Sequence, residues 1–206
     1  AVAQQQGQLP AVQSGYTALL DISNKIRTAD PKSIAGPLKQ AQGLSWRISA
    51  QDPKDDMGDL AKQCQTQAQR VLAKQPQHPY ACNILSVCIG VEAALAFSNR
   101  QDPVPLLRKA IAVLEPILQS NPHFLDGFRN MGVRYSYLAQ EALRNGGSEA
   151  SGLFDKALSY YQQTLDIDPS DAGALTSAAE VRTKVMPTAM SMLNVQALAQ
   201  QGEQDA

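Results

Sequence analysis

Two short motifs decide the fold of this chain: LQSNP at residues 118–122 and LDIDP at residues 165–169. Twelve residues before the proline of each motif stands an alanine, Ala110 or Ala157, and a lysine precedes that alanine in both copies. Eight residues before each proline stands a large apolar side chain. The two copies therefore share a pattern that extends beyond the motifs themselves, which indicates an internal repeat.

The prolines that end the repeat occur at near-constant intervals along the chain. Two poorer copies of the ending precede the two good ones, and the four prolines are separated by 45, 46 and 47 residues: Pro31, Pro76, Pro122 and Pro169. The chain has 12 prolines in 206 residues, so such regular spacing is hard to obtain by accident. A period of about 20 to 50 residues is typical of solenoids and other repeat arrays.

The sequence between these prolines predicts helices. Aromatic residues make up only 5% of the chain, and a composition dominated by Ala, Gln and Leu favours helices over strands. Asp-Pro and Asn-Pro pairs mark the end of one helix and the start of the next, because proline fits the first turn of a helix. We expect eight helices, near residues 11–28, 32–50, 54–74, 79–99, 103–120, 123–144, 149–166 and 171–199. The short loops predict that neighbouring helices form antiparallel hairpins.

The segment that follows Pro122 resembles the tetratricopeptide repeat. The residues that match the large–x–x–large–Gly–x–x–Tyr pattern of its helix A are Phe128, Met131, Gly132 and Tyr135, and those that match helix B are Ala157, Tyr161 and Pro169. Gly132 and Ala157 would let two helix backbones approach closely, with aromatic side chains around the contact. The resemblance implies an all-α fold, an α-solenoid of antiparallel helix hairpins with a C-terminal capping helix.

The repeats are 11 to 13 residues longer than the 34-residue repeat of that family, and we expect the surplus to extend helix A. The phrase at residues 99–103, followed by Asn121-Pro122 and Gly132, is similar to the long-helix tetratricopeptide tails of bacterial serine/threonine kinases. The chain has no Gly-rich loop, His-Arg-Asp or Asp-Phe-Gly motif, so the kinase itself is absent from this sequence.

The domain organisation follows from the repeat. We expect a disordered N-terminus at residues 1–10, a helical repeat domain at residues 11–200 with repeat boundaries near 31, 76, 122 and 169, and a disordered C-terminus at residues 201–206. Both ends are Gln-rich and lack periodic apolar residues. The last helix contains three methionines within seven residues after Val185, and Pro187 should kink or break it. That segment either folds back as a cap or makes a homo-oligomer contact.

Composition and motifs exclude several classes of function. A net charge of −1 is unlike the basic stripe of nucleic-acid binders, and the longest apolar run is too short to cross a bilayer. Three cysteines cannot all pair, and we expect Cys64, Cys82 and Cys88 to be buried structural thiols. No histidine has a second ligand at metal-binding spacing, and no nucleophile elbow, P-loop or dinucleotide motif occurs. We therefore expect no enzyme activity, no metal and no cofactor.

The resemblance implies that helix A lines a concave groove. The residues it places there come from the first helices of successive repeats: Trp46, Tyr80, Asn83, Asp126, Arg129, Asn130, Val133, Tyr137, Glu180 and Lys184. Arg129 and Asn130 could hold a peptide backbone or a carboxylate, and the tyrosines would supply apolar contacts. The alternative interpretation is that Asp126 and Arg129 are ordinary solvated charges.

These features predict a scaffold module that binds a peptide or partner domain, within a larger bacterial protein such as a kinase with a regulatory tail. The alternative is a small-molecule sensor or carrier domain that uses a pocket between the long helices, and a third interpretation is an oligomerising spacer. The sequence leaves both cytoplasm and periplasm open, with a lean to the cytoplasm.

Overall fold

The computed structural model describes residues 2–52, 54–185 and 187. Within these ranges the chain forms helices and no strand. The eight α-helices are α1 (Val2–Ala29), α2 (Ala35–Ala50), α3 (Met57–Leu72), α4 (Pro79–Ser98), α5 (Val104–Ser120), α6 (Leu125–Arg144), α7 (Ala150–Ile167) and α8 (Ala172–Glu180). A π-helical segment, Val181–Val185, follows α8 directly.

The predicted helices are confirmed one by one, with differences at the two ends of the chain. The first helix begins at Val2 and contains Pro10, so residues that were expected to be disordered lie in α1. At the other end, α8 gives way to the π-helical segment shortly before Pro187. The Met-rich stretch and residues 201–206 lie outside the described residues, and so does the choice between a cap and an oligomer contact.

The chain divides into two compact units between Ile117 and Leu118, within the last turn of α5. We call the part up to Ile117 unit 1 and the part from Leu118 unit 2. One helical repeat domain over residues 11–200 stays a prediction.

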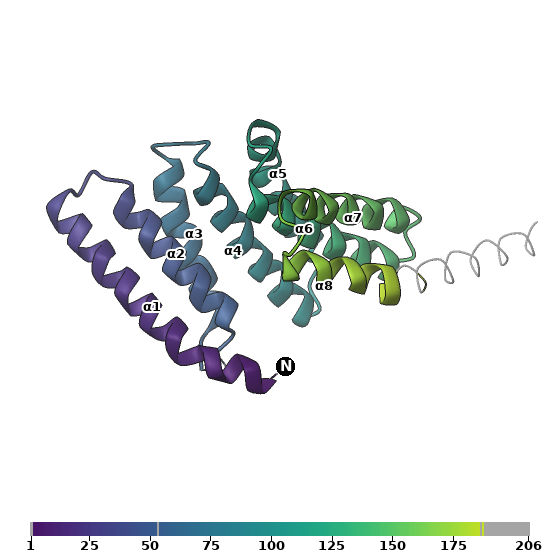
Figure 1. The fold of residues 1–206 in the computed structure, drawn as a ribbon, viewed down its shortest axis with the longest axis horizontal. Helices are drawn as coiled ribbons and strands as arrows, with labels where there is room; N and C mark the ends of the chain where they lie inside the picture. Colours follow the sequence, from purple (N-terminus) through teal and green to yellow (C-terminus); the bar gives the residue numbers. More distant parts are fainter. Residues whose placement is uncertain (1, 53, 186, 188–206) are drawn as a thin grey trace, which may run out of the picture. The chain divides into compact units, whose positions relative to one another are not determined.

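Unit 1 is a row of antiparallel helices packed in the order of the sequence. As Figure 1 shows, α1 lies against α2, α2 against α3 and α3 against α4, and α2 also contacts α4. Its core is formed by small and branched side chains that include Ala41, Leu44, Ala68, Ile89 and, from α5, Ala110. The contact between α2 and α4 joins the first helices of two successive repeats, which is the packing of an α-solenoid.

Unit 2 repeats this arrangement with α6, α7 and α8, and α6 contacts α8 as α2 contacts α4. The predicted close approach of α6 and α7 is confirmed, because a Cβ built on Gly132 would lie 2.5 Å from Cε1 of Tyr161. Ala157 is fully buried in the same interface. The all-α solenoid of helix hairpins that the sequence predicted is therefore the observed fold class.

The cysteines differ from the prediction. Cys64 of α3 and Cys88 of α4 form a disulfide with their Cα atoms 6.2 Å apart, and both side chains are fully buried in the core of unit 1. The expectation that Cys64 and Cys88 are thiols is wrong. It followed from the position of each cysteine within its own helix, whereas the disulfide depends on which sides of α3 and α4 face each other. Cys82 is a buried free thiol, as predicted, and burial raises its pKa.

Helix α4 also corrects the expectation that no segment is long and apolar enough to cross a membrane. The helix has 20 residues, and an 18-residue stretch of it has a mean hydropathy of 1.7, which meets that criterion by length and composition. However, 61% of this stretch is buried inside the protein. A helix that is apolar on all sides is typical of a buried core element as well as of a membrane span.

The acidic pair before α3 serves two separate purposes. Asp56 is the N-cap of α3, and its Oδ1 accepts hydrogen bonds from the backbone N–H groups of Gly58 and Asp59. Asp55 lies before the helix, and its nearly buried carboxylate pairs with the guanidinium of Arg47 in α2. Arg47 also lies over the ring of Tyr16, 5.0 Å from its centroid, so these contacts connect α1, α2 and the start of α3.

Candidate functional site

A cavity of about 250 Å³ lies among α6, α7 and the end of α8 in unit 2. It is lined by side chains of mixed polarity: Val133, Ser136, Tyr137, Gln140, Tyr161, Ser177, Glu180 and Val181. The structure thus brings together three of the residues that the sequence placed in the groove, namely Val133, Tyr137 and Glu180. Val133 and Tyr137 come from α6 and Glu180 comes from α8, which are the first helices of two successive repeats.

The spacing of residues along α6 explains why this helix forms one wall of the cavity. Residues three and four positions apart share one face of an α-helix, and Val133, Ser136, Tyr137 and Gln140 follow that spacing. The opposite side of α6 carries the buried residues Met131 and Leu138. The cavity wall is therefore one stripe of an amphipathic helix, on which Tyr137 is 48% exposed and Ser136 is buried.

Tyr161 of α7 forms the base of the cavity and is only 2% exposed. Burial raises the pKa of Tyr161 to about 12, although a hydrogen bond with the side chain of Ser177 in α8 acts in the opposite direction. Its ring lies against Gly132, where the missing side chain makes room for it. The base of the cavity is therefore held by contacts to both flanking helices, which makes it a rigid floor.

Asp126, Arg129 and Asn130 lie in the first two turns of α6, on the same side as the cavity or next to it. Arg129 donates to Asp126 over 2.6 Å and to Asp171 over 2.5 Å, so both terminal nitrogens of its guanidinium are bonded within the chain. Asp171 also caps α8, because its Oδ1 accepts from the N–H of Ala174 over 2.7 Å. Arg129 thus fastens α6 to α8, which differs from its expected role as a ligand for a partner carboxylate. Asn130 is half-buried.

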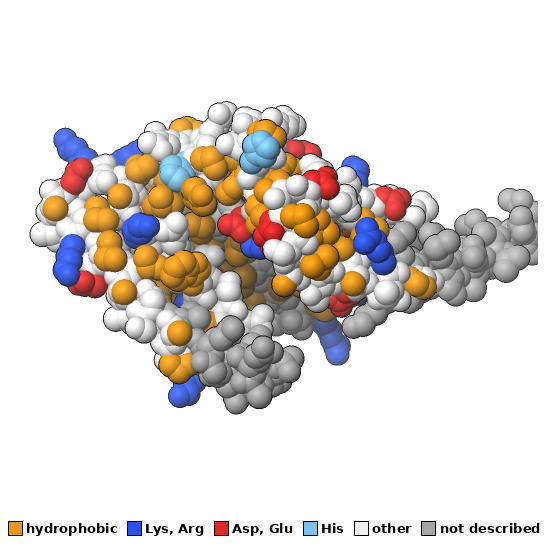
Figure 2. Space-filling view, in the orientation of Figure 1, with side chains coloured by type: hydrophobic (Ala, Val, Ile, Leu, Met, Phe, Trp, Pro, Cys, Tyr) orange, Lys and Arg blue, Asp and Glu red, His pale blue; other side chains and the backbone are white. Residues whose placement is uncertain are grey.

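The remaining predicted groove residues fall in unit 1 or outside the description. Trp46 of α2 is 55% exposed, with its ring beside Gly15 of α1. Tyr80 of α4 is 53% exposed, whereas Asn83 is buried. The side chain of Lys184 lies outside the described residues. In the face shown in Figure 2, unit 1 carries hydrophobic side chains with charges of both signs scattered among them.

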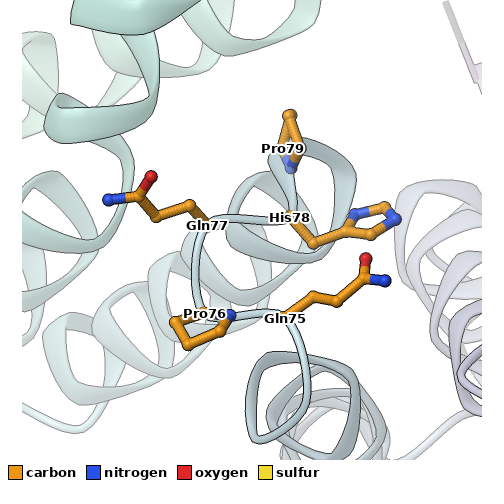
Figure 3. A pocket seen from close by; sticks show the side chains of 5 residues that line it. All are labelled: Gln75, Pro76, Gln77, His78 and Pro79. Carbon is orange, nitrogen blue, oxygen red and sulfur yellow. The ribbon is translucent and has the colours of Figure 1, made fainter.

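A second hollow, of about 550 Å³, is formed by five consecutive residues, Gln75–Pro79, in the turn between α3 and α4. Figure 3 shows that the side chains of Gln75 and His78 point to one side of this turn and that of Gln77 to the other. His78 caps α4, since its Nδ1 accepts from the N–H of Ala81 over 3.3 Å. This hollow is a feature of the helix connection, and all of its lining residues come from one turn.

Among the residues that the structure describes, no three His, Cys, Asp or Glu side chains are grouped closely enough to hold a metal ion. Five residues of the unit 2 cavity were not predicted from the sequence: Ser136, Gln140, Tyr161, Ser177 and Val181. Two of them could have been found, because Ser136 and Gln140 continue the helical stripe of Val133 and Tyr137. Tyr161 was assigned to the core, where it also belongs, and nothing in the sequence indicates that its ring reaches the cavity.

Arg134 is buried next to this stripe but is not part of the cavity wall. Burial lowers its pKa to about 10, and its Nε has no hydrogen-bond partner. One residue is about 100° of rotation on an α-helix, so Arg134 lies on a different face of α6 from the lining residue Val133. Arg134 interacts electrostatically with Tyr137 and Tyr161 of the cavity but does not line it.

Comparisons with known proteins add little to this geometry. No protein family model matches the chain. Among solved structures, the chain is similar to one described as the crystal structure of MamA, with 16% sequence identity, a TM-score of 0.46 and 97% of each chain covered. A likeness at that level supports no conclusion about function, and the site must be argued from its own residues.

Proposed function

We propose that this chain is a protein-interaction module that binds a segment of a partner protein on the face formed by the first helices of its repeats. The observation that supports this proposal most directly is the cavity in unit 2, because Val133, Tyr137 and Glu180 from two repeats line it together. In this proposal the chain has no catalytic residue and acts through recognition alone.

The side chains of the cavity suit the recognition of a protein segment. Tyr137 is a large, half-exposed aromatic residue that has few rotatable bonds, a type that is enriched among the residues that dominate binding energy. The hydroxyl and amide groups around it can bond to the polar groups of a peptide. The rigid floor formed by Tyr161 reduces the entropy that would be lost on binding.

The volume of the cavity bears on the alternative of a small-molecule sensor. Pockets for drug-sized ligands and cofactors usually measure about 300 to 1,000 Å³ and enclose most of the ligand. The unit 2 cavity, at about 250 Å³, is below that range and is the right size for one side chain of a partner. The hollow at Gln75–Pro79, at about 550 Å³, falls within that range, but one turn alone lines it and it does not enclose a ligand. We therefore favour a protein partner over a whole small molecule.

A photo-crosslinking amino acid at position 137 tests this proposal. It should form a discrete crosslink to one protein in a lysate of the parent organism, and the same amino acid at Asp155, an exposed residue of α7 outside the cavity, should not. Equal crosslinking from both positions, or none from position 137, contradicts the proposal. A small molecule retained by the purified chain in native mass spectrometry would instead support the sensor.

The resemblance to kinase tails supports a further part of the proposal, that the module regulates an enzyme within a larger bacterial protein. A kinase domain encoded in the same reading frame would agree with this part. A full-length protein without any enzyme domain would contradict it and leave the binding proposal standing.

A further inference from the structure

We infer that the unit 2 cavity binds a positively charged side chain, an ammonium or a guanidinium group, of the partner. This inference rests on the proposed function and names the chemical class of the group that enters the cavity. The cavity combines a carboxylate, several hydrogen-bond acceptors and an exposed aromatic ring.

The first argument is the charge of the lining. Glu180 is the one carboxylate among the lining residues, and none of them is a lysine or an arginine. No lysine or arginine whose side chain the structure describes forms an ion pair with Glu180. Two arginines of α6 lie near this cavity. Arg129 is already bonded to two carboxylates. Arg134 is buried and interacts electrostatically with Tyr137 and Tyr161, but it does not line the cavity. Glu180 is therefore a carboxylate of the lining with which a cationic group of the partner can pair.

The second argument is the set of acceptors. Gln140 donates its Nε2 to Oγ of Ser136 over 3.3 Å, which leaves the amide oxygen as an acceptor. The hydroxyl oxygens of Ser136 and Ser177 can accept as well. An ammonium group has three donors and a guanidinium has five, and neither has an acceptor, so these groups match a lining that is rich in oxygen.

The third argument is the ring of Tyr137. Cations are attracted to the face of an aromatic ring when they lie within about 6 Å of its centroid. Tyr137 is 48% exposed and belongs to the same cavity as Glu180. A carboxylate and an aromatic ring in one small cavity favour a cation and disfavour an anion, because the carboxylate would repel an acidic side chain.

The test uses the whole chain and three small probes. Methylguanidinium and n-propylammonium represent the side-chain ends of arginine and lysine, and acetate represents an acidic group. Titration followed by NMR should shift the ring signals of Tyr137 and the amide signals of Ser177 and Glu180 with at least one cation, and should leave them unchanged with acetate at the same ionic strength. Shifts with acetate alone, or with none of the probes, overturn the inference.

Variants make the test specific to the cavity. Glu180→Gln should weaken binding of the cation about fivefold, as expected for loss of one exposed ion pair. Tyr137→Phe, which keeps the ring, should bind nearly as well as the parent, and Tyr137→Leu should bind less well. Asp155→Asn removes the same charge from an exposed site on α7 and should have no effect. Equal weakening by Glu180→Gln and Asp155→Asn overturns the inference, because it would show a general charge effect.

The outcome is independent of the crosslinking experiment. Cation binding without a protein crosslink at position 137 would contradict the proposed function and leave the inference about the cavity in place. A crosslinked partner without cation binding would support the function and overturn the assignment of the ligand class.

Discussion

At the scale of single residues, the contact between Gly132 and Tyr161 sets the distance between α6 and α7. A Cβ at position 132 would lie 2.5 to 3.0 Å from three atoms of the Tyr161 ring, which is far inside van der Waals contact. Tyr161 is only 2% exposed and is hydrogen-bonded to Ser177, so its ring cannot turn away freely. Any side chain at position 132 must therefore push the two helices apart.

We expect Gly132→Ala to lower the free energy of unfolding by about 1 to 3 kcal/mol, the usual cost of overpacking a core. The matched control is Gly152→Ala in α7, where a Cβ would meet nothing within 4 Å. That change should be neutral or stabilising by up to about 1 kcal/mol, since alanine favours a helix more than glycine does. Urea unfolding followed by circular dichroism measures both, and equal effects at the two positions would contradict the close approach.

Tyr161 also makes the stability depend on alkaline pH. Its pKa is raised to about 12 in the folded protein by burial, whereas a tyrosine in an unfolded chain titrates near 10. The folded chain therefore keeps a proton that the unfolded chain loses, so this contribution to stability is complete below about pH 10 and is lost as the pH rises towards 12. Tyr161→Phe should decline less steeply than the parent between these values. The free energy of unfolding of both proteins is to be measured at intervals from pH 9 to 12. An equal decrease for the parent and for Tyr161→Phe would contradict the prediction.

Of two contacts made by single residues, Gly132 with Tyr161 and Arg129 with Asp171, only the first could be predicted from the sequence. The small residue Gly132 and the large residue Tyr161 occupy known places in a repeat pattern, so their contact was predicted before any coordinates. The bond between Arg129 and Asp171 joins residues 42 positions apart and has no counterpart in that pattern. It depends on how α8 stacks against α6, which is a tertiary feature.

At the scale of helices, the sequence predicted the number and order of the elements well because prolines mark their boundaries. Every predicted helix from α2 to α7 overlaps its observed counterpart within a few residues. The disulfide between Cys64 and Cys88 was missed because its two residues lie on different helices, 24 residues apart. Only the facing of α3 and α4 brings them together, and helical periodicity alone does not determine which helix faces overlap.

We expect the unfolded chain, in the absence of reductant, to show one reactive thiol, that of Cys82, and to show three after reduction. Cys64→Ser combined with Cys88→Ser should lower the free energy of unfolding by roughly 3 kcal/mol, because the crosslink closes a loop of moderate length in the unfolded chain. Cys82→Ala is the control, since it removes a buried thiol and keeps the crosslink. Three reactive thiols before reduction would contradict the pairing of Cys64 with Cys88.

At the scale of the whole molecule, the division after Ile117 predicts that damage to one unit remains local. Repeat proteins are stabilised mainly by contacts between neighbouring elements, so a disturbance spreads over a limited range. In amide hydrogen exchange, Gly132→Ala should speed exchange in α6, α7 and α8 more than in α1 to α4. The variant with both Cys64→Ser and Cys88→Ser should speed exchange in α1 to α4 more than in α6, α7 and α8. Uniform acceleration in all helices would show instead that the units unfold as one.

Asp171 has a consequence for building new arrays from these parts. One of its oxygens starts α8 by accepting from Ala174, and the other bonds to Arg129 on α6. The carboxylate of Asp171 thus takes part both in starting the fourth repeat and in aligning it on the third. An engineer who grafts a further hairpin after Pro169 must carry over this aspartate together with its arginine. The aspartate alone would begin the new helix without aligning it, and the arginine alone would lack one of its two carboxylate partners.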